Sequence, residues 1–260
     1  SITIGLGLLT LYFFKLEKYV SFESSLWRPR FDIWKKMMDI GLPAGGEMLI
    51  LFVYFSAVYW LIQDFGAVAQ AGFSIGGRIM QSIFMPTMAI AFAVGPIIGQ
   101  NFGAGKSDRV RETFNSGIIL SSLVMFITTV IMQWRPELLV MFFTDDAEVI
   151  EVGAVFLQLI SLNFVAQGIV FTCSGVFQGL GNTRPALLSS GVRILIFIPI
   201  AVYLRYQPNF SINMVWYVSI LSVTAQAIVS FLLARREFRR KLGRGDEQPS
   251  TPAVPAESAA

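Results

Sequence analysis

Residues 84–111 read FMPTMAIAFAVGPIIGQNFGAGKSDRVR, an apolar run that passes into a glycine cluster and a basic loop. From Ile79 to Ile98 the chain carries no Asp, Glu, Lys or Arg, and a helix of that length can cross a hydrocarbon core ~30 Å thick. We expect Gly99, Gly103 and Gly105 to end the helix, because glycine readily adopts the left-handed backbone that follows one. The cations that come next mark the cytoplasmic side of a membrane.

The composition of the chain indicates that lipid is its main solvent. Of its 260 residues 54% are hydrophobic and only 14% are charged, against about 25% in a typical soluble domain. The Lys and Arg residues cluster beside apolar runs, a pattern typical of membrane topology and not of a nucleic-acid partner. The chain has no His and a single cysteine, Cys173, so we expect neither an enzyme nor a cofactor, an internal disulfide or a thiolate metal site.

Six apolar segments are long enough to span a bilayer, and they predict an all-α membrane protein with a six-transmembrane-helix bundle at 40–234. They run from about Ile40 to Ile62, Ala71 to Gly99, Gly117 to Gln133, Gly153 to Phe177, Ala186 to Leu204 and Ile212 to Ala234. We expect residues 1–14 to be the end of a truncated transmembrane helix and residues 15–39 to be a polar linker or a short amphipathic piece at the interface. Residues 235–260 should form a basic and then disordered cytoplasmic tail.

The distribution of cations predicts the orientation of these spans. If consecutive spans alternate in direction, one side of the membrane receives nearly all Lys and Arg residues outside the spans, with a bias of about eight to one. The other side receives only Arg135 and Arg205. We therefore expect a multi-pass protein whose C-terminus lies in the cytoplasm.

Glu47 is the only acidic residue well inside a predicted span. An ionised carboxylate at the bilayer centre costs roughly 2.5 kcal/mol or more, so this side chain needs a cavity or a partner. It lies about one turn from the cytoplasmic end of its span, however, so extension to the interface is an alternative. Glu47 is therefore a candidate for the transport pathway or for coupling at an H⁺ or Na⁺ site, and a structural role stays open.

Four further side chains are candidates for the transport pathway. Arg78 and Arg193 each lie about two turns inside a span, where a guanidinium must pair with a carboxylate or with free backbone carbonyls. We expect Asp64 to be the partner of Arg78, since both lie toward the outer side. Asn163 and Gln167 are four residues apart and should share one face of the fourth span. Such a face either contacts another helix or lines a wet cavity.

Four motifs stand at or near the ends of these spans. They are Gly41-Leu42-Pro43 at the start of one span, Pro86 in the next, GQNFGAG at 99–105 before the basic loop, and QGLGNTRP at 178–185 between the fourth and fifth spans. In these motifs, and in the order and spacing of all six spans, the chain resembles the C-terminal half of the multidrug and toxic compound extrusion (MATE) transporters. The resemblance covers roughly residues 35–235.

The resemblance implies a twelve-helix transporter of two pseudo-symmetric lobes, with residues 15–39 as the cytoplasmic inter-lobe linker to the missing N-terminal six-helix lobe. Such proteins lie among the lipids of the bacterial cytoplasmic (inner) membrane. They export cationic or amphipathic small molecules in exchange for H⁺ or Na⁺, by alternating access between the two lobes. A lipid-linked oligosaccharide flippase of the same superfamily is the alternative. It should line its cavity with several cations to hold a phosphate, and only Arg78 and Arg193 are available here.

The chain departs from the family pattern at the residues that bind the coupling ion. Many members carry an acidic residue eight positions after the proline that opens the seventh helix. Here that position is Leu51, and Glu47 lies one turn earlier on the same face. Some members carry an aspartate in the tenth helix, where this chain has only Asn163 and Gln167. These departures leave room for coupling through acids of the missing lobe.

Overall fold

The structure is a computed structural model that describes residues 2–15 and 30–242. It divides the chain into two units, Ser1–Met38 and Asp39–Ala260, and each is described here by itself. The first unit contains α1 (Ile2–Lys15) and the first turns of α2, where the rings of Phe31 and Trp34 meet edge to face at 5.6 Å. The rest of the predicted linker, residues 16–29, lies outside the described residues, as does the tail from residue 243.

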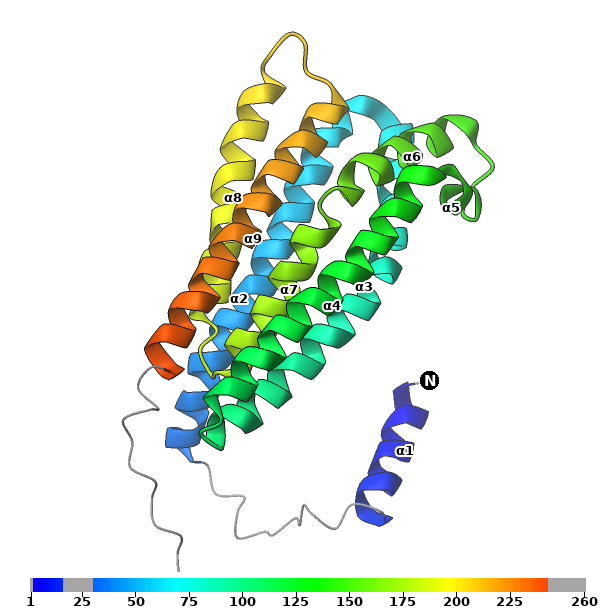
Figure 1. The fold of residues 1–260 in the computed structure, drawn as a ribbon. Helices are drawn as coiled ribbons and strands as arrows, with labels where there is room; N and C mark the ends of the chain where they lie inside the picture. Colours follow the sequence, from blue (N-terminus) through cyan, green and yellow to red (C-terminus); the bar gives the residue numbers. More distant parts are fainter. Residues whose placement is uncertain (1, 16–29, 243–260) are drawn as a thin grey trace, which may run out of the picture. The chain divides into compact units, whose positions relative to one another are not determined.

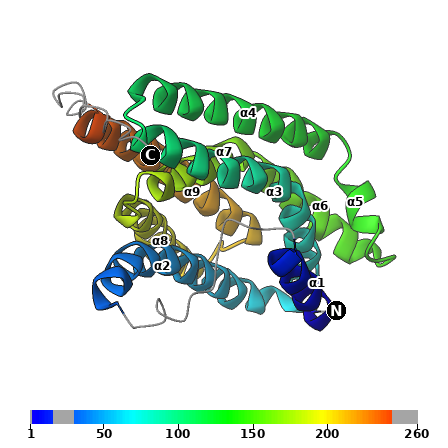
Figure 2. The same cartoon turned by 90° about the horizontal axis from the view of Figure 1, so that it is seen from below.

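The second unit is a bundle of helices. Its elements are α2 (Phe31–Ile62), the short 3₁₀ helix η2 (Gln63–Phe65), α3 (Gly66–Gly103), α4 (Ser107–Trp134), α5 (Glu137–Met141), α6 (Ala147–Ser161), α7 (Phe164–Gly179), α8 (Arg184–Arg205) and α9 (Ile212–Leu242). No strand occurs within residues 2–15 and 30–242. The long helices run side by side (Figure 1), and the view from below shows α7 and α9 between α2 and α8 on one side and α3 and α4 on the other (Figure 2).

The lengths and the hydropathy of these helices define a multi-pass membrane protein. Within the described residues, four helical stretches are long and apolar enough to cross a membrane: Phe31–Gly103, Ser107–Trp134, Arg184–Arg205 and Ile212–Leu242. The bent pair formed by α6 and α7 makes a fifth if it counts as one span. The first stretch contains both α2 and α3, which η2 joins.

The helices extend beyond the apolar segments that predict them. α2 begins at Phe31 rather than at Ile40, and α9 continues to Leu242 rather than ending at Ala234. The added turns of both helices carry charged side chains, so hydropathy does not detect them. The backbone hydrogen bonding of each helix nevertheless continues through these turns. The first residues of the predicted basic tail are therefore part of α9.

The fourth predicted span is formed by two helices that meet at a bend. α6 ends at Ser161, α7 begins at Phe164, and the two helices meet with a bend of 58°. Side chains of α4 bind carbonyl groups near the end of α6: Thr129 Oγ1 donates to Ser161 O at 2.9 Å, and Gln133 Nε2 donates to Gln158 O at 2.7 Å. A helix kinks where side chains enter its hydrogen-bond ladder, so α4 stabilises the bend.

α3 and α7 approach each other closely because each carries a row of glycines. Gly95 and Gly99 lie on α3, and Gly175 and Gly179 lie on α7. A Cβ atom added to Gly95 would stand 3.2 Å from the carbonyl oxygen of Gly175, and one added to Gly179 would clash with the carbonyl oxygen of Gly95. Within a membrane, small residues at this spacing let two helix backbones pack tightly.

Two apolar cores fill the bundle, one toward each end. The first includes Phe73 and Trp216, whose rings stack at 5.6 Å. The second includes Phe114 and Phe238, whose rings meet edge to face at 5.0 Å. On α9 the buried polar residue Gln226 lies between them. The two cores are therefore separated by a layer that includes polar side chains.

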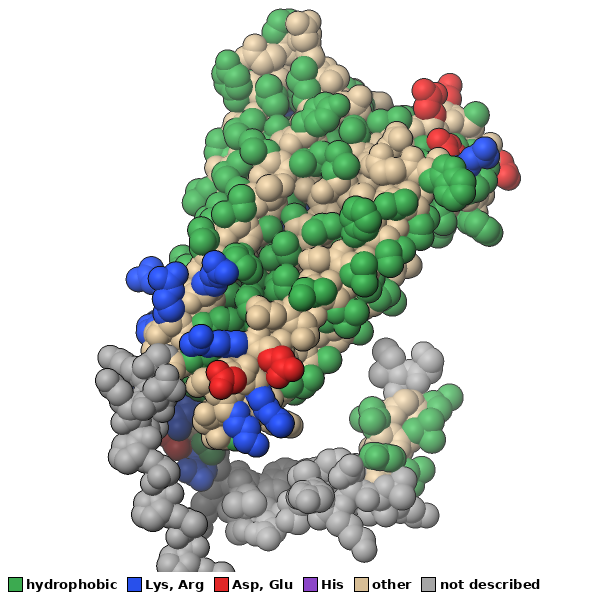
Figure 3. Space-filling view, in the orientation of Figure 1, with side chains coloured by type: hydrophobic (Ala, Val, Ile, Leu, Met, Phe, Trp, Pro, Cys, Tyr) green, Lys and Arg blue, Asp and Glu red, His purple; other side chains and the backbone are tan. Residues whose placement is uncertain are grey.

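The two ends of the bundle differ in charge. Cations gather at the end where α3 turns into α4 and where α9 ends (Figure 3). The glycine cluster makes that turn, since α3 ends at Gly103 and Gly105 has a φ of +70°. At the opposite end Arg205 pairs with Asp64 at 2.6 Å and its guanidinium lies 3.9 Å from the centre of the Trp60 ring.

Candidate functional site

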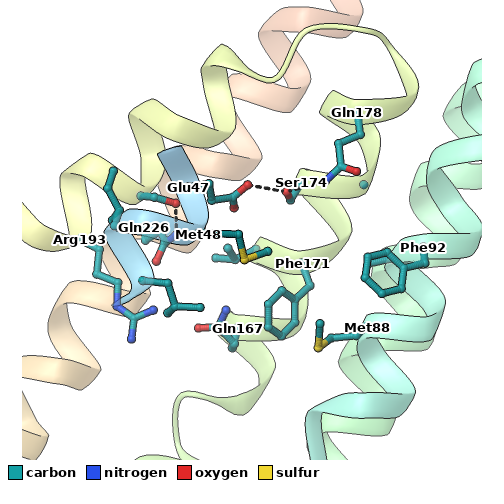
Figure 4. Close-up of a pocket in the computed structure, with 16 residues that line it drawn as sticks. Glu47, Met48, Met88, Phe92, Gln167, Phe171, Ser174, Gln178, Arg193 and Gln226 are labelled. Carbon is teal, nitrogen blue, oxygen red and sulfur yellow. Dashed lines mark hydrogen bonds between the residues drawn. The ribbon is translucent and has the colours of Figure 1, made fainter. Parts of the chain in front are cut away.

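A cavity lies between the two apolar cores, midway along the bundle, and is lined by α2, α3, α7, α8 and α9 (Figure 4). Its polar side chains come from four of these helices and are Glu47, Gln167, Ser174, Gln178, Ser190, Arg193 and Gln226. Its volume of about 70 Å³ holds a few water molecules, since one water needs roughly 10–15 Å³ of such space. Substrate and ion sites of secondary transporters lie at this depth.

Glu47 turns its carboxyl group into the bundle, toward α7. Ser174 Oγ donates a hydrogen bond of 2.9 Å to the Glu47 carboxylate. Helix α8 packs closely against α2 next to Glu47, because Gly46 has no side chain. A Cβ atom added to Gly46 would stand 2.9 Å from Leu187 Cδ1. None of the ion pairs within residues 2–15 and 30–242 includes Glu47. Its carboxylate is therefore available to a cation that enters the cavity.

Arg193 enters the same cavity from α8. Its side chain is buried, and its guanidinium carbon lies 3.7 Å from the centre of the Tyr54 ring on α2. Tyr54 is fixed in turn by a hydrogen bond between its hydroxyl group and that of Ser219 on α9. Stacking of this kind is favourable for a guanidinium, which is more weakly hydrated than an ammonium group. The structure thus brings Glu47 and Arg193, two of the sequence candidates, to one site.

Two buried glutamines complete the polar lining. Gln226 of α9 donates through Nε2 to Ser190 Oγ on α8 at 3.1 Å, and its Oε1 is buried without a hydrogen-bond partner among the described residues. Gln167 faces the cavity from α7. Buried amide atoms without protein partners are sites for water or for polar groups of a ligand.

Asn163 does not line the cavity with Gln167. Asn163 lies at the bend and precedes the first turn of α7, where its carbonyl oxygen accepts from Gln167 N at 2.8 Å. Its side chain is buried, lies outside the cavity lining, and has no hydrogen-bond partner in the described part of the chain. Asn163 therefore lies one helical turn before Gln167, next to the bend, and only Gln167 lines the cavity.

The expected pair of Arg78 with Asp64 is also wrong. Asp64 pairs with Arg205 of α8, and Arg78 is exposed and does not line the cavity. Asp64 lies in η2, and the residues of α3 from Gly66 to Arg78 span about 18 Å, which exceeds the reach of an arginine side chain.

Other lining residues carry no distinctive sequence signal. Met48, Met88, Phe92 and Phe171 face the cavity, although methionines and phenylalanines in a span contact lipid or other helices by default. Ser190 is one of many hydroxyl residues in the spans, and only the packing of α8 against α9 brings it to Gln226. No group of three or more His, Cys, Asp or Glu side chains that suits a metal ion occurs within residues 2–15 and 30–242. The carboxylate, hydroxyl and amide oxygens of the cavity suit a proton or a hard cation.

A helical membrane bundle with a cavity at mid-depth that includes several polar side chains is the architecture of one lobe of a secondary transporter. The MatE family model matches residues 43–203, more than half of the chain, and the chain belongs to this family of transporters.

Relatives with curated descriptions support the family. Over 191 residues the chain is 28% identical to the probable multidrug resistance protein NorM of Thermotoga maritima, covering 74% of this chain and 41% of that protein. Over 230 residues it is 24% identical to the multidrug export protein MepA of Staphylococcus aureus, covering 87% and 50%. The chain spans about half the length of the curated relatives it matches.

A solved structure shares the fold. It is described as the outward-facing conformation of a multidrug resistance MATE family transporter. It superposes with a TM-score of 0.82 over 91% of this chain and 54% of that chain, at 19% sequence identity. The bundle therefore superposes on about half of that longer protein.

Proposed function

We propose that this chain is one lobe of an exporter that exchanges an amphipathic small molecule for H⁺ or Na⁺. The observation that carries the proposal is the carboxylate of Glu47, which faces the cavity between the two apolar cores and accepts a hydrogen bond from Ser174. A cation and the positive group of a substrate compete for this one carboxylate. Because each binds after the other has left, this competition couples the movement of the two ligands in opposite directions.

The proposed lobe has six membrane crossings, formed by α2, α3, α4, the bent pair α6–α7, α8 and α9. The stretch Phe31–Gly103 supplies two of them, since α2 and α3 run in opposite directions in Figure 1. The cationic end of the bundle faces the cytoplasm in this arrangement. NorM and MepA are about twice as long and are described as multidrug resistance and export proteins, which supports a second lobe of similar size. The two lobes would move against each other around the cavity.

We favour exchange of a drug or metabolite over flipping of a lipid-linked sugar. A flippase needs several cations in its cavity to hold a phosphate group. Arg193 lines the cavity, whereas Arg78 lies outside it. The remaining wall includes Met48, Met88 and Phe171, which suit an apolar and variable substrate.

Glu47→Gln in the intact transporter tests this function. The amide keeps the shape of the side chain but removes its charge, so we expect export driven by a proton or sodium gradient in proteoliposomes to be abolished. Membrane insertion and melting temperature should stay near those of the unaltered protein. Glu112→Gln, at an exposed position of α4, is the matched control and should leave export unchanged. Full gradient-driven export in Glu47→Gln would remove Glu47 from coupling.

A further inference from the structure

A second pocket lies at the cationic end of the bundle, apart from the cavity that contains Glu47. Its lining comes from α2 near Asp39, from the connection between α7 and α8, from the first turns of α8 and from the last turns of α9. Its volume is about 520 Å³, against about 70 Å³ for the cavity. The charged residues of its lining are four cations and two carboxylates: Arg184, Arg236, Arg240, Lys241, Asp39 and Glu237. The exchange proposed at Glu47 gives this pocket no role.

The buried carboxylate of this pocket is already neutralised by the chain itself. Glu237 is 5% exposed, and its Oε1 accepts from Arg240 Nη2 at 2.8 Å and from Asn182 Nδ2 at 3.0 Å. Lys241 Nζ lies 3.6 Å from the same oxygen and donates to the carbonyl oxygen of Leu180. Glu237 therefore ties α9 to the connection between α7 and α8, and its charge is balanced.

Two arginines of the lining have no such counter-ion. Arg184 of α8 and Arg236 of α9 are exposed, and none of the ion pairs within residues 2–15 and 30–242 includes either of them. The pocket therefore carries an excess of positive charge that attracts an anion. The planar guanidinium group matches the oxygens of a phosphate, to which it can donate two hydrogen bonds.

The pocket also lies at the depth of lipid headgroups. Arg184 lies two residues before the apolar segment 186–204, and Arg236 lies two residues after the apolar segment 212–234. One helical turn deeper on the same face, Leu188 follows Arg184 on α8 and Leu233 precedes Arg236 on α9, and both leucines line the pocket. Cations outside and leucines toward the bilayer core repeat the order of a phospholipid, whose phosphate precedes its acyl chains.

We propose that this pocket binds one anionic phospholipid, whose phosphate contacts Arg184 and Arg236 and whose acyl chains lie on Leu188 and Leu233. Basic pockets between transmembrane helices bind the headgroups of such lipids. The two leucines favour a lipid over a soluble phosphate compound, because only a lipid covers them. This inference depends on the position of the bundle in a membrane and not on exchange at Glu47.

Two lipids that differ only in the headgroup test the pocket. Dioleoyl phosphatidylglycerol and dioleoyl phosphatidylcholine have the same acyl chains, and only the first has a net negative charge. Native mass spectrometry measures how tightly the purified intact transporter retains each. One arginine near the membrane surface favours an anionic lipid by about fivefold. The double variant Arg184→Gln/Arg236→Gln should therefore bind phosphatidylglycerol roughly 25-fold more weakly and phosphatidylcholine as before.

The matched control removes the same charge from the same end of the bundle. Lys106→Gln/Arg109→Gln changes two exposed cations outside the pocket and should leave the preference for phosphatidylglycerol intact. Equal losses in the two double variants would overturn the proposal, because general surface charge would then explain the binding. Equal retention of the two lipids by the unaltered protein would also overturn it. If the first double variant does not fold, Arg236→Gln alone should show the fivefold loss, and no loss there would contradict the proposal.

Two further measurements identify what occupies the pocket. Millimolar glycerol 1-phosphate, which has a phosphate but no acyl chain, should not displace phosphatidylglycerol, and displacement would assign the pocket to soluble phosphates instead. Asp246→Asn/Glu247→Gln should bind the lipid like the unaltered protein, whereas binding in that variant alone would assign the pocket to the acidic residues after α9. Glu47→Gln should keep the lipid preference, so failure of the exchange and failure of the lipid site are separate results.

Discussion

Gly179 occupies a position where a single methyl group decides whether α3 and α7 fit together. Its Cα faces the carbonyl oxygen of Gly95, and an added Cβ atom would clash with that oxygen. Because a backbone atom cannot rotate away, Gly179→Ala should lower the free energy of unfolding by about 1–3 kcal/mol, the usual cost of overpacking. The melting temperature of the purified protein in detergent measures this change.

The matched control is Gly77→Ala, in the interior of α3. Nothing lies within 4 Å of a Cβ atom built there, so the higher helix propensity of alanine should leave the protein as stable or more stable. A similar loss of stability in Gly179→Ala and Gly77→Ala would mean that the cost comes from replacing a glycine in a helix, and not from the close approach of α3 and α7.

Individual residues differ in how much the sequence reveals about them. Glu47 and Arg193 are recognisable in the sequence because a charged side chain inside an apolar segment is costly unless it has a partner or faces a cavity. Their hydrogen-bond and stacking partners, Ser174 and Tyr54, are ordinary residues for a span, and only the packing of α2 against α7 and α8 assigns them. Arg78 was given the wrong partner, since closeness to one side of the membrane does not specify which helix lies adjacent.

At the level of single elements, the bend between α6 and α7 depends on α4. Thr129 reaches across to Ser161 O at 2.9 Å, whereas the neighbouring Thr128 bonds only within α4. Thr129→Val should therefore leave a carbonyl group of α6 without its partner and lower the free energy of unfolding by about 1–2 kcal/mol. Thr128→Val should have little effect. Thermal unfolding of the two variants checks this, and equal losses would contradict a role for α4 in the bend.

The sequence predicts most helices but not this break. The run from Gly153 to Phe177 carries no charged residue, and neither glycine nor proline occurs at positions 162 and 163. The side chains that hold the end of α6 come from residues earlier in the chain by 25 and 32 positions. A signal of that kind is tertiary, so no local pattern contains it.

For the molecule as a whole, the testable property is its orientation. In a Cys173→Ala background, Asn209→Cys lies in the connection between α8 and α9, and Asp108→Cys lies at the start of α4. We expect a membrane-impermeant maleimide to label Asn209→Cys on intact spheroplasts and to label Asp108→Cys only after lysis, because cations mark the cytoplasmic end. The reverse pattern would invert the topology. A reporter fused after Ala260 should accordingly read cytoplasmic.

The overall plan follows from the sequence better than the arrangement does. The lengths of the apolar segments predict the helices. The uneven distribution of cations among the connections predicts which helix ends share one side of the membrane, and Figure 3 shows Lys and Arg side chains clustered at one end of the bundle. The sequence does not predict which helices contact each other. The contact of α3 with α7 depends on Gly95, Gly99, Gly175 and Gly179, and glycine also occurs in every other predicted span except the sixth. The sequence therefore predicts some of the residues that line the cavity but not the position of the cavity in the bundle.

The division of the interior into two apolar cores has a mechanical consequence. Each end of the lobe is a densely packed block that resists deformation, because tightly interlocked side chains have few alternative arrangements. Between them, Glu47, Arg193 and Gln226 line a cavity of about 70 Å³ and make few polar contacts. We expect the side chains of this layer to rearrange more easily than those of either core, because a cavity leaves them with fewer packing partners. A ligand that binds at this depth would therefore fill the least densely packed layer of the bundle and would change the few polar contacts that cross it.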